Sequence, residues 1–70
     1  MLDIGRVIQE RRKDKRWSQE QLGRKVGVTQ SAVYQIEGAS DKIQISTIQK
    51  YADALGLTVL DIVEDAQCLD

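Results

Sequence analysis

The chain has no histidine, no proline and no phenylalanine, and its 70 residues include a single cysteine, Cys68. One cysteine excludes a disulfide within the chain and a zinc site built from cysteines. Without histidine, and with carboxylates scattered along the sequence, neither a nucleophile–base pair nor a metal cluster can be assembled. A glycine-rich phosphate loop is also missing. We therefore expect no enzyme and no bound metal or cofactor.

Long apolar runs are missing as well. No run approaches the roughly 18 residues of a membrane span, and Asp3 and Gly5 interrupt the start of the chain, where no signal peptide is visible. We expect a reduced, soluble, cytoplasmic domain without a membrane partner. Residues 1–70 suit a single domain, which buries only about 60 % of its unfolded surface and has no room for a substrate cavity. Since nothing follows residue 70, we expect no effector domain and regulation by concentration alone.

Residues 18–37 carry the most informative pattern. Ser18, with Gln21 three residues later, has the form of a capping box and predicts the start of a helix. Gly27 predicts its end, because glycine tolerates the left-handed conformation that closes a helix. Thr29 then caps a second helix, and hydrophobic staples support the boundaries by pairing Trp17 with Leu22, Val28 with Val33 and Leu57 with Ile62. Two helices joined by about three residues with a glycine form a helix-turn-helix, whose second helix can enter a DNA major groove.

The rest of the chain predicts three more helices. Their expected starts are caps at Asp3, at Ser46 with Gln49 as a second capping box, and at Thr58. The first runs to about Lys15, Gly56 ends the second, and the third is short and precedes an acidic tail over residues 64–70. A loop from Gly38, closed by Ile43 and Ile45, precedes Ser46. The positions assigned to the core are Ile4, Val7, Ile8, Leu22, Val26, Ala32, Val33, Ile36, Ile48, Tyr51, Ala52 and Leu55. The expected fold is all-α, a compact five-helix bundle without a sheet.

Charge is distributed unevenly. Residues 1–30 carry eight basic and four acidic side chains, a balance of +4, and residues 31–70 carry two basic and seven acidic ones, a balance of −5. The asymmetry predicts a basic face and an acidic far side. Because few cations face phosphates, non-specific DNA binding should be weak and its salt dependence moderate.

These features together resemble the phage repressor and Cro-type helix-turn-helix domain, also called the xenobiotic-response-element type. The resemblance extends from Ile4 to Val63, about six-sevenths of the chain. It is carried in order by Arg12, by Ser18-Gln19-Glu20-Gln21-Leu22, by Gly27-Val28-Thr29-Gln30-Ser31, by Ile36-Glu37 and by Ala54-Leu55-Gly56-Leu57. It implies a lambda-repressor-like bundle that binds double-stranded DNA through the second helix of the motif.

The resemblance also implies roles for individual residues. Gln30, Ser31 and Gln35 are assigned to base edges, and Tyr34 to a thymine methyl group or a phosphate. Glutamine suits this role because its amide donates and accepts at once and matches adenine N6 and N7. Gln19, near a helix N-terminus, lies at a phosphate and braces Gln30. The expected phosphate contacts are Arg12, Ser18, Gln19, Ser40 and Lys42.

Two further implied roles are structural. Arg12 pairs with Glu37 and holds the recognition helix against the first helix, while Gly23 leaves room for the recognition helix to cross closely. The chain departs from the family after Glu37, where Gly38-Ala39-Ser40-Asp41-Lys42 loses a cation and gains Asp41. The basic run from Arg11 to Arg16 offers compensation, and within it Lys13 and Lys15 either contact phosphates or face solvent.

The resulting hypothesis is a transcriptional repressor that binds a pseudo-palindromic operator as a homodimer, with one recognition helix per half-site. Leu57, Val59, Leu60 and Val63 either form the dimer surface or complete the monomer core. Two alternatives remain open. One is an antitoxin that binds both its operator and a toxin, and the other is a protein-interaction module that has lost DNA binding.

Overall fold

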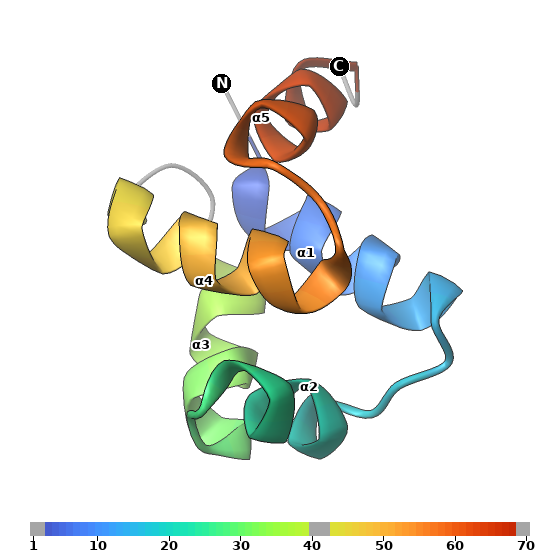
Figure 1. The fold of residues 1–70 in the computed structure, drawn as a ribbon, viewed down its shortest axis with the longest axis vertical. Coiled ribbons are helices and arrows are strands. Elements are labelled where there is room, and N and C mark those ends of the chain that lie inside the picture. The colour runs from blue at the N-terminus through green and yellow to red at the C-terminus, as the bar shows by residue number, and fades with distance from the viewer. Residues whose placement is uncertain (1–2, 40–42, 69–70) are drawn as a thin grey trace.

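The computed structural model describes residues 3–39 and 43–68, and this part of the chain contains five α-helices and no strand. The helices are α1 (Ile4–Asp14), α2 (Gln19–Val26), α3 (Gln30–Gly38), α4 (Ile45–Leu55) and α5 (Val59–Cys68). In Figure 1, α2 and α3 form one end of the molecule and α5 the other, with α1 and α4 between them. The all-α prediction is confirmed. None of the described helices combines the length and the apolar run needed to cross a membrane.

Most of the helix boundaries follow from local capping chemistry. Asp3 accepts a hydrogen bond from the Arg6 amide at the start of α1. Ser18 and Gln21 form the predicted capping box. The Gln21 amide donates to the Ser18 hydroxyl at 3.1 Å, and the Ser18 amide donates to the Gln21 side-chain oxygen at 2.7 Å. Thr29 caps α3 with a single bond, since its hydroxyl accepts from the Ala32 amide at 3.2 Å. Gly27 closes α2 at a φ of 91°.

The start of α5 is a reciprocal pair of the same kind. The Asp61 amide donates to the Thr58 hydroxyl at 3.1 Å, and the Thr58 amide donates to the Asp61 carboxylate at 3.0 Å. The hydrogen bond from the Thr58 backbone is the main reason why the pKa of Asp61 is lowered from its ordinary value. Gly56, at a φ of 74°, ends α4 as predicted.

The predicted capping box at Ser46 is wrong. Helix α4 begins at Ile45, because the carbonyl of Gln44 accepts the amides of Thr47 and Ile48, both at 3.0 Å. Gln44 is therefore the N-cap, and it caps without a side-chain hydrogen bond. Ile45, expected to close the preceding loop, lies on the first turn of α4 and is 71 % exposed. Gly38, expected to start that loop, is the last residue of α3.

The expected acidic tail is also different in the structure, since residues 64–68 continue α5. Ala66 is fully buried in the core, which anchors this part of the helix. Asp65 forms an ion pair with Arg11 of α1, whose Nε donates to the carboxylate at 2.9 Å. That hydrogen bond raises the pKa of the Arg11 guanidinium. The end of α5 is thus packed and paired against α1.

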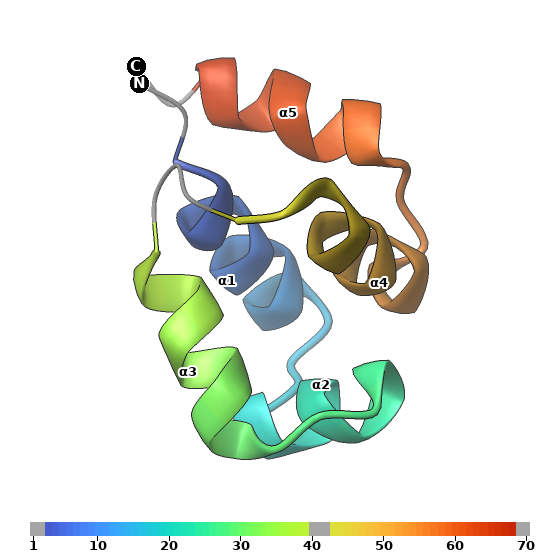
Figure 2. The same ribbon diagram turned by 90° about the vertical axis from the view of Figure 1, so that its left-hand side faces the viewer.

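The core lies between the five helices, whose arrangement Figure 2 shows from a second side. Apolar side chains spaced three or four residues apart bury one face of each helix, as the periodicity predicted. The fully enclosed members are Ile4, Val7, Ile8, Leu22, Val33, Ile48, Tyr51, Ala52, Leu55, Ile62 and Ala66. Val26, Ile36, Leu57, Val59 and Val63 pack against them while partly exposed. Leu57, Val59 and Val63 therefore contribute to the monomer core, whereas Leu60 is 63 % exposed.

One close approach fixes the position of α3 on α1. The Gly5 amide donates to the carbonyl of Ala39 at 3.2 Å, which joins the start of α1 to the residue after α3. A Cβ atom at position 5 would lie 2.8 Å from the Glu37 carbonyl oxygen and still closer to the carbonyls of Ile36 and Ala39. Only glycine allows this contact, because the opposing atoms are backbone.

Substitution of Gly5 by alanine is expected to lower the free energy of unfolding by about 1–3 kcal/mol, the usual cost of overpacking a close contact. Urea unfolding monitored by circular dichroism measures it. Gly38→Ala is the matched control, because a Cβ atom at position 38 meets nothing within 4 Å. Equal unfolding midpoints for the two variants would contradict the assignment of Gly5 to this contact.

Candidate nucleic-acid interface

The turn between α2 and α3 is built on Gly23 and Gly27. The carbonyl of Gly23 accepts the amides of Gly27 and Val28, at 2.7 and 2.8 Å. A Cβ atom at Gly23 would lie 2.7 Å from the Val28 carbonyl oxygen. The predicted close approach is present, but the backbone that approaches Gly23 belongs to the turn at Val28 and Thr29 rather than to α3 itself. This glycine lets α3 leave the turn at a fixed angle.

The outward face of α3 is polar and exposed. Gln30, Ser31, Tyr34 and Gln35 are all exposed, whereas Val33 on the opposite face is fully buried. The aromatic ring of Tyr34 is prominent, at 69 % exposure of the residue. The structure thus places the four residues predicted to contact bases side by side, and they line one shallow depression together with Gln19.

A buried ion pair attaches α3 to α1. Arg12 Nε donates to Glu37 Oε2 at 2.6 Å, and Arg12 Nη2 donates to Glu37 Oε1 at 3.1 Å. The side chains are only 10 % and 3 % exposed. The third guanidinium nitrogen, Nη1, donates to the carbonyl of Trp17 at 2.7 Å. This is the predicted pair, and its two parallel hydrogen bonds fix the orientation of both side chains.

Gln19 joins the same cluster. Its amide nitrogen donates to Glu37 Oε1 at 3.1 Å. Gln19 was predicted to brace Gln30, and the residue that it contacts is Glu37 instead. The reason is geometric, since the Glu37 carboxylate lies between α1 and the start of α2 and accepts from both. Glu37 also contributes, after burial itself, to raising the pKa of the enclosed Tyr51 hydroxyl. We name Arg12, Gln19 and Glu37 the clamp.

Besides Arg12, five basic side chains have partners within the molecule. Arg6, Arg11 and Arg24 form ion pairs with Glu10, Asp65 and Glu20.

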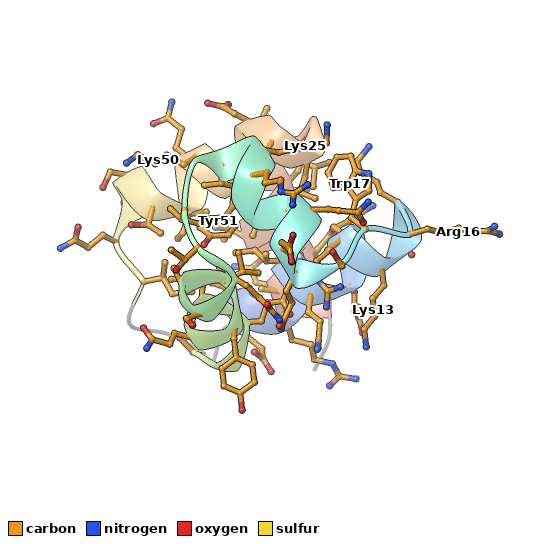
Figure 3. All side chains as sticks on the ribbon, turned by 90° about the horizontal axis from the view of Figure 1, so that it is seen from below. Lys13, Arg16, Trp17, Lys25, Lys50 and Tyr51 are labelled. Carbon is orange, nitrogen blue, oxygen red and sulfur yellow. The ribbon has the colours of Figure 1, made fainter. Side chains whose placement is uncertain are left out.

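Lys15 and Lys25 place their ammonium groups over the ring of Trp17, 5.4 and 4.8 Å from its centroid. In Figure 3, which looks onto the α2–α3 end, Trp17 and Lys25 lie across α2 from α3, whereas Lys13 lies beside α1. Several cations of the basic half are thus engaged within the molecule.

Two predicted phosphate contacts, Ser40 and Lys42, lie outside the described residues. Conversely, the structure adds a residue that the sequence reading missed, Gln9 of α1. It lines a second depression with Gln19, Tyr34, Gln35, Glu37 and Gly38. The spacing of Gln9 and Arg12 in the sequence indicates this position. The two residues are three apart on α1, so Gln9 lies on the side of α1 that faces α3.

Comparison with known proteins agrees with this geometry. A helix-turn-helix family of the Cro type matches residues 8–62 of the chain. The chain belongs to this family. Its fold is similar to a solved structure described as the hypothetical transcription factor NHTF from Neisseria, with a TM-score of 0.78 and 28 % identity over 96 % of this chain and 80 % of that one. No curated protein matches significantly. This helix-turn-helix protein is a DNA-binding transcription regulator, a class whose members typically are not enzymes.

The clamp predicts a non-additive effect on stability. Glu37→Leu leaves the Arg12 guanidinium buried without its carboxylate, and we expect it to lower the free energy of unfolding by about 3–5 kcal/mol. The double substitution Arg12→Met with Glu37→Leu removes both charges and should be more stable than Glu37→Leu alone. Urea unfolding of Glu37→Leu, of Arg12→Met and of the double variant measures the coupling energy between the two side chains. Purely additive effects would show that the pair is not energetically connected.

Proposed function

We propose that this regulator is a repressor that occupies a pseudo-palindromic operator as a homodimer in the cytoplasm, with α3 of each subunit in a major groove. The observation that supports it best is the exposed row of Gln30, Ser31, Tyr34 and Gln35 on a helix held by the clamp. An amide that donates and accepts at once reads adenine in the major groove. A preorganised helix binds without first having to be ordered.

The phosphate contacts in this proposal surround the start of α2. Ser18 and Gln19 lie at its N-terminus, where a helix favours an anion. Arg12 remains an expected contact, although its guanidinium is engaged with Glu37 and with the carbonyl of Trp17. Ser40 and Lys42 remain expected contacts from the segment between α3 and α4. These contacts would set the register of the protein on the duplex, while α3 reads its sequence.

The proposed dimer surface is the face of α5 that carries Leu60, with Leu57, Val59 and Val63 at its base. It lies at the end of the molecule remote from α2 and α3 in Figure 1, so that pairing through it leaves α3 uncovered. Leu60 is exposed and apolar, whereas the other three are partly buried and pack against the core. Dimeric proteins of this kind use half-sites about 10 base pairs apart.

Selection of bound duplexes from a random pool, at low and moderate salt, tests the proposal. We expect an enriched pseudo-palindrome. On that sequence Gln35→Ala should lose about 1–3 kcal/mol of binding free energy and relax the preference at one base pair per half-site. Gln67→Ala, which changes an exposed glutamine of α5, is the control. No enrichment at either salt concentration would overturn sequence-specific binding and favour a protein-binding role.

The dimer is tested by Leu60→Glu, which places a charge on the proposed surface. Because Leu60 is exposed in the monomer, we expect the fold to persist, while sedimentation shows a shift from dimer to monomer. Ile45→Glu is a matched control, since Ile45 is comparably exposed on α4. A wild-type chain that sediments as a monomer, both free and on DNA, would contradict the proposal, as would equal effects of the two substitutions.

A further inference from the structure

Helix α1 brings a second surface alongside the outward polar face of α3. We call that face, formed by Gln30, Ser31, Tyr34 and Gln35, the reading face. Gln9 of α1 lines the same depression as Tyr34 and Gln35, two residues of that reading face. Residues four apart on a helix lie one above the other on one side. Lys13 therefore continues the side of α1 on which Gln9 lies, one turn nearer the start of α2. Gln9 is half-buried, and Lys13 is exposed.

The two lysines near the end of α1 occupy different surroundings. Lys15 lies over the ring of Trp17, which Lys25 also approaches. Figure 3 shows Trp17 and Lys25 on the side of α2 away from α3, while Lys13 projects from α1 in the lower part of the view, where α3 also lies. A duplex that receives α3 in its groove would thus bring a backbone strand toward Lys13 rather than toward Lys15.

From this juxtaposition we infer that Gln9 and Lys13 form an additional DNA contact, separate from the helix-turn-helix. Lys13 binds a backbone phosphate beside the groove that α3 enters, and the amide of Gln9 donates to the same stretch of backbone. The inference rests on the proposed entry of α3 into the major groove. It assigns part of the affinity to α1, whose other face packs into the core through Ile4, Val7 and Ile8.

The test compares Lys13→Gln with Lys15→Gln on the selected duplex, with affinity measured by filter binding from 50 to 300 mM salt. A lysine that displaces one counterion contributes about 0.9 to the slope of log K against log salt. Lys13→Gln should therefore reduce the slope by about 0.9 per bound chain and weaken binding roughly five- to tenfold at 0.1 M salt. Lys15→Gln should leave the slope unchanged.

Gln9→Ala is the third variant. Because its side chain is neutral, we expect weaker binding with an unchanged slope, and Gln67→Ala again serves as the control. Circular dichroism melting of each variant separates loss of fold from loss of contact, since a merely structural role of Lys13 at the end of α1 would change the melting temperature and not the slope.

The outcomes are distinct. A wild-type protein that fails to select a duplex overturns the proposed function and this inference with it. Specific wild-type binding combined with equal slopes for wild type and Lys13→Gln overturns the Lys13 contact alone. A reduced slope for Lys15→Gln and not for Lys13→Gln would show that the strand passes on the Trp17 side. Unchanged binding by Gln9→Ala would remove Gln9 from the contact.

Discussion

The position of the recognition helix depends on one carboxylate, that of Glu37. It accepts two hydrogen bonds from Arg12 of α1 and one from Gln19 of α2, and Arg12 also holds the carbonyl of Trp17 between those helices. A buried ion pair contributes little net stability, because desolvation offsets attraction, but it tolerates few alternative arrangements. Gly5, at the start of α1, also donates to the carbonyl of Ala39, so the C-terminal end of α3 is attached to α1 at two points. Its outward face is therefore oriented by α1 as much as by the turn from α2.

The charge pattern has a related consequence. The net charge is −1, and several arginines are occupied by ion pairs within the molecule. The exposed face of α3 carries amides and hydroxyl groups instead of cations. Such a surface attracts DNA weakly at long range but offers directional donors and acceptors at short range. In the proposed complex, discrimination between sequences would rest on amide geometry, and cations would act at the border of the face.

The sequence predicted the features that depend on neighbours in the chain. Ser18, Thr29 and Thr58 cap where expected, because a cap needs only the residues that follow it. The predicted cap at Ser46 is wrong although Ser46 fits the same rule, since the Gln44 carbonyl already starts α4 two residues earlier.

The contacts between helices were harder to predict. The close approach at Gly5 was not predicted, because it exists only once α3 lies against α1. The resemblance supplied the Arg12–Glu37 pair, yet the partner of Gln19 depended on the angle at which the helices meet. The base, phosphate and dimer contacts stay predictions.

Trp17 is the only tryptophan of the chain, and its place in the fold makes it an intrinsic optical probe. Its ring is half-buried against the core and lies under two ammonium groups, while its carbonyl accepts a hydrogen bond from Arg12. Indole fluorescence depends on exposure and on nearby charge, so the emission of Trp17 reports the state of the junction between α1 and α2. Because this junction lies across α2 from the reading face, the signal follows loosening of the clamp without a dye attached near bound DNA.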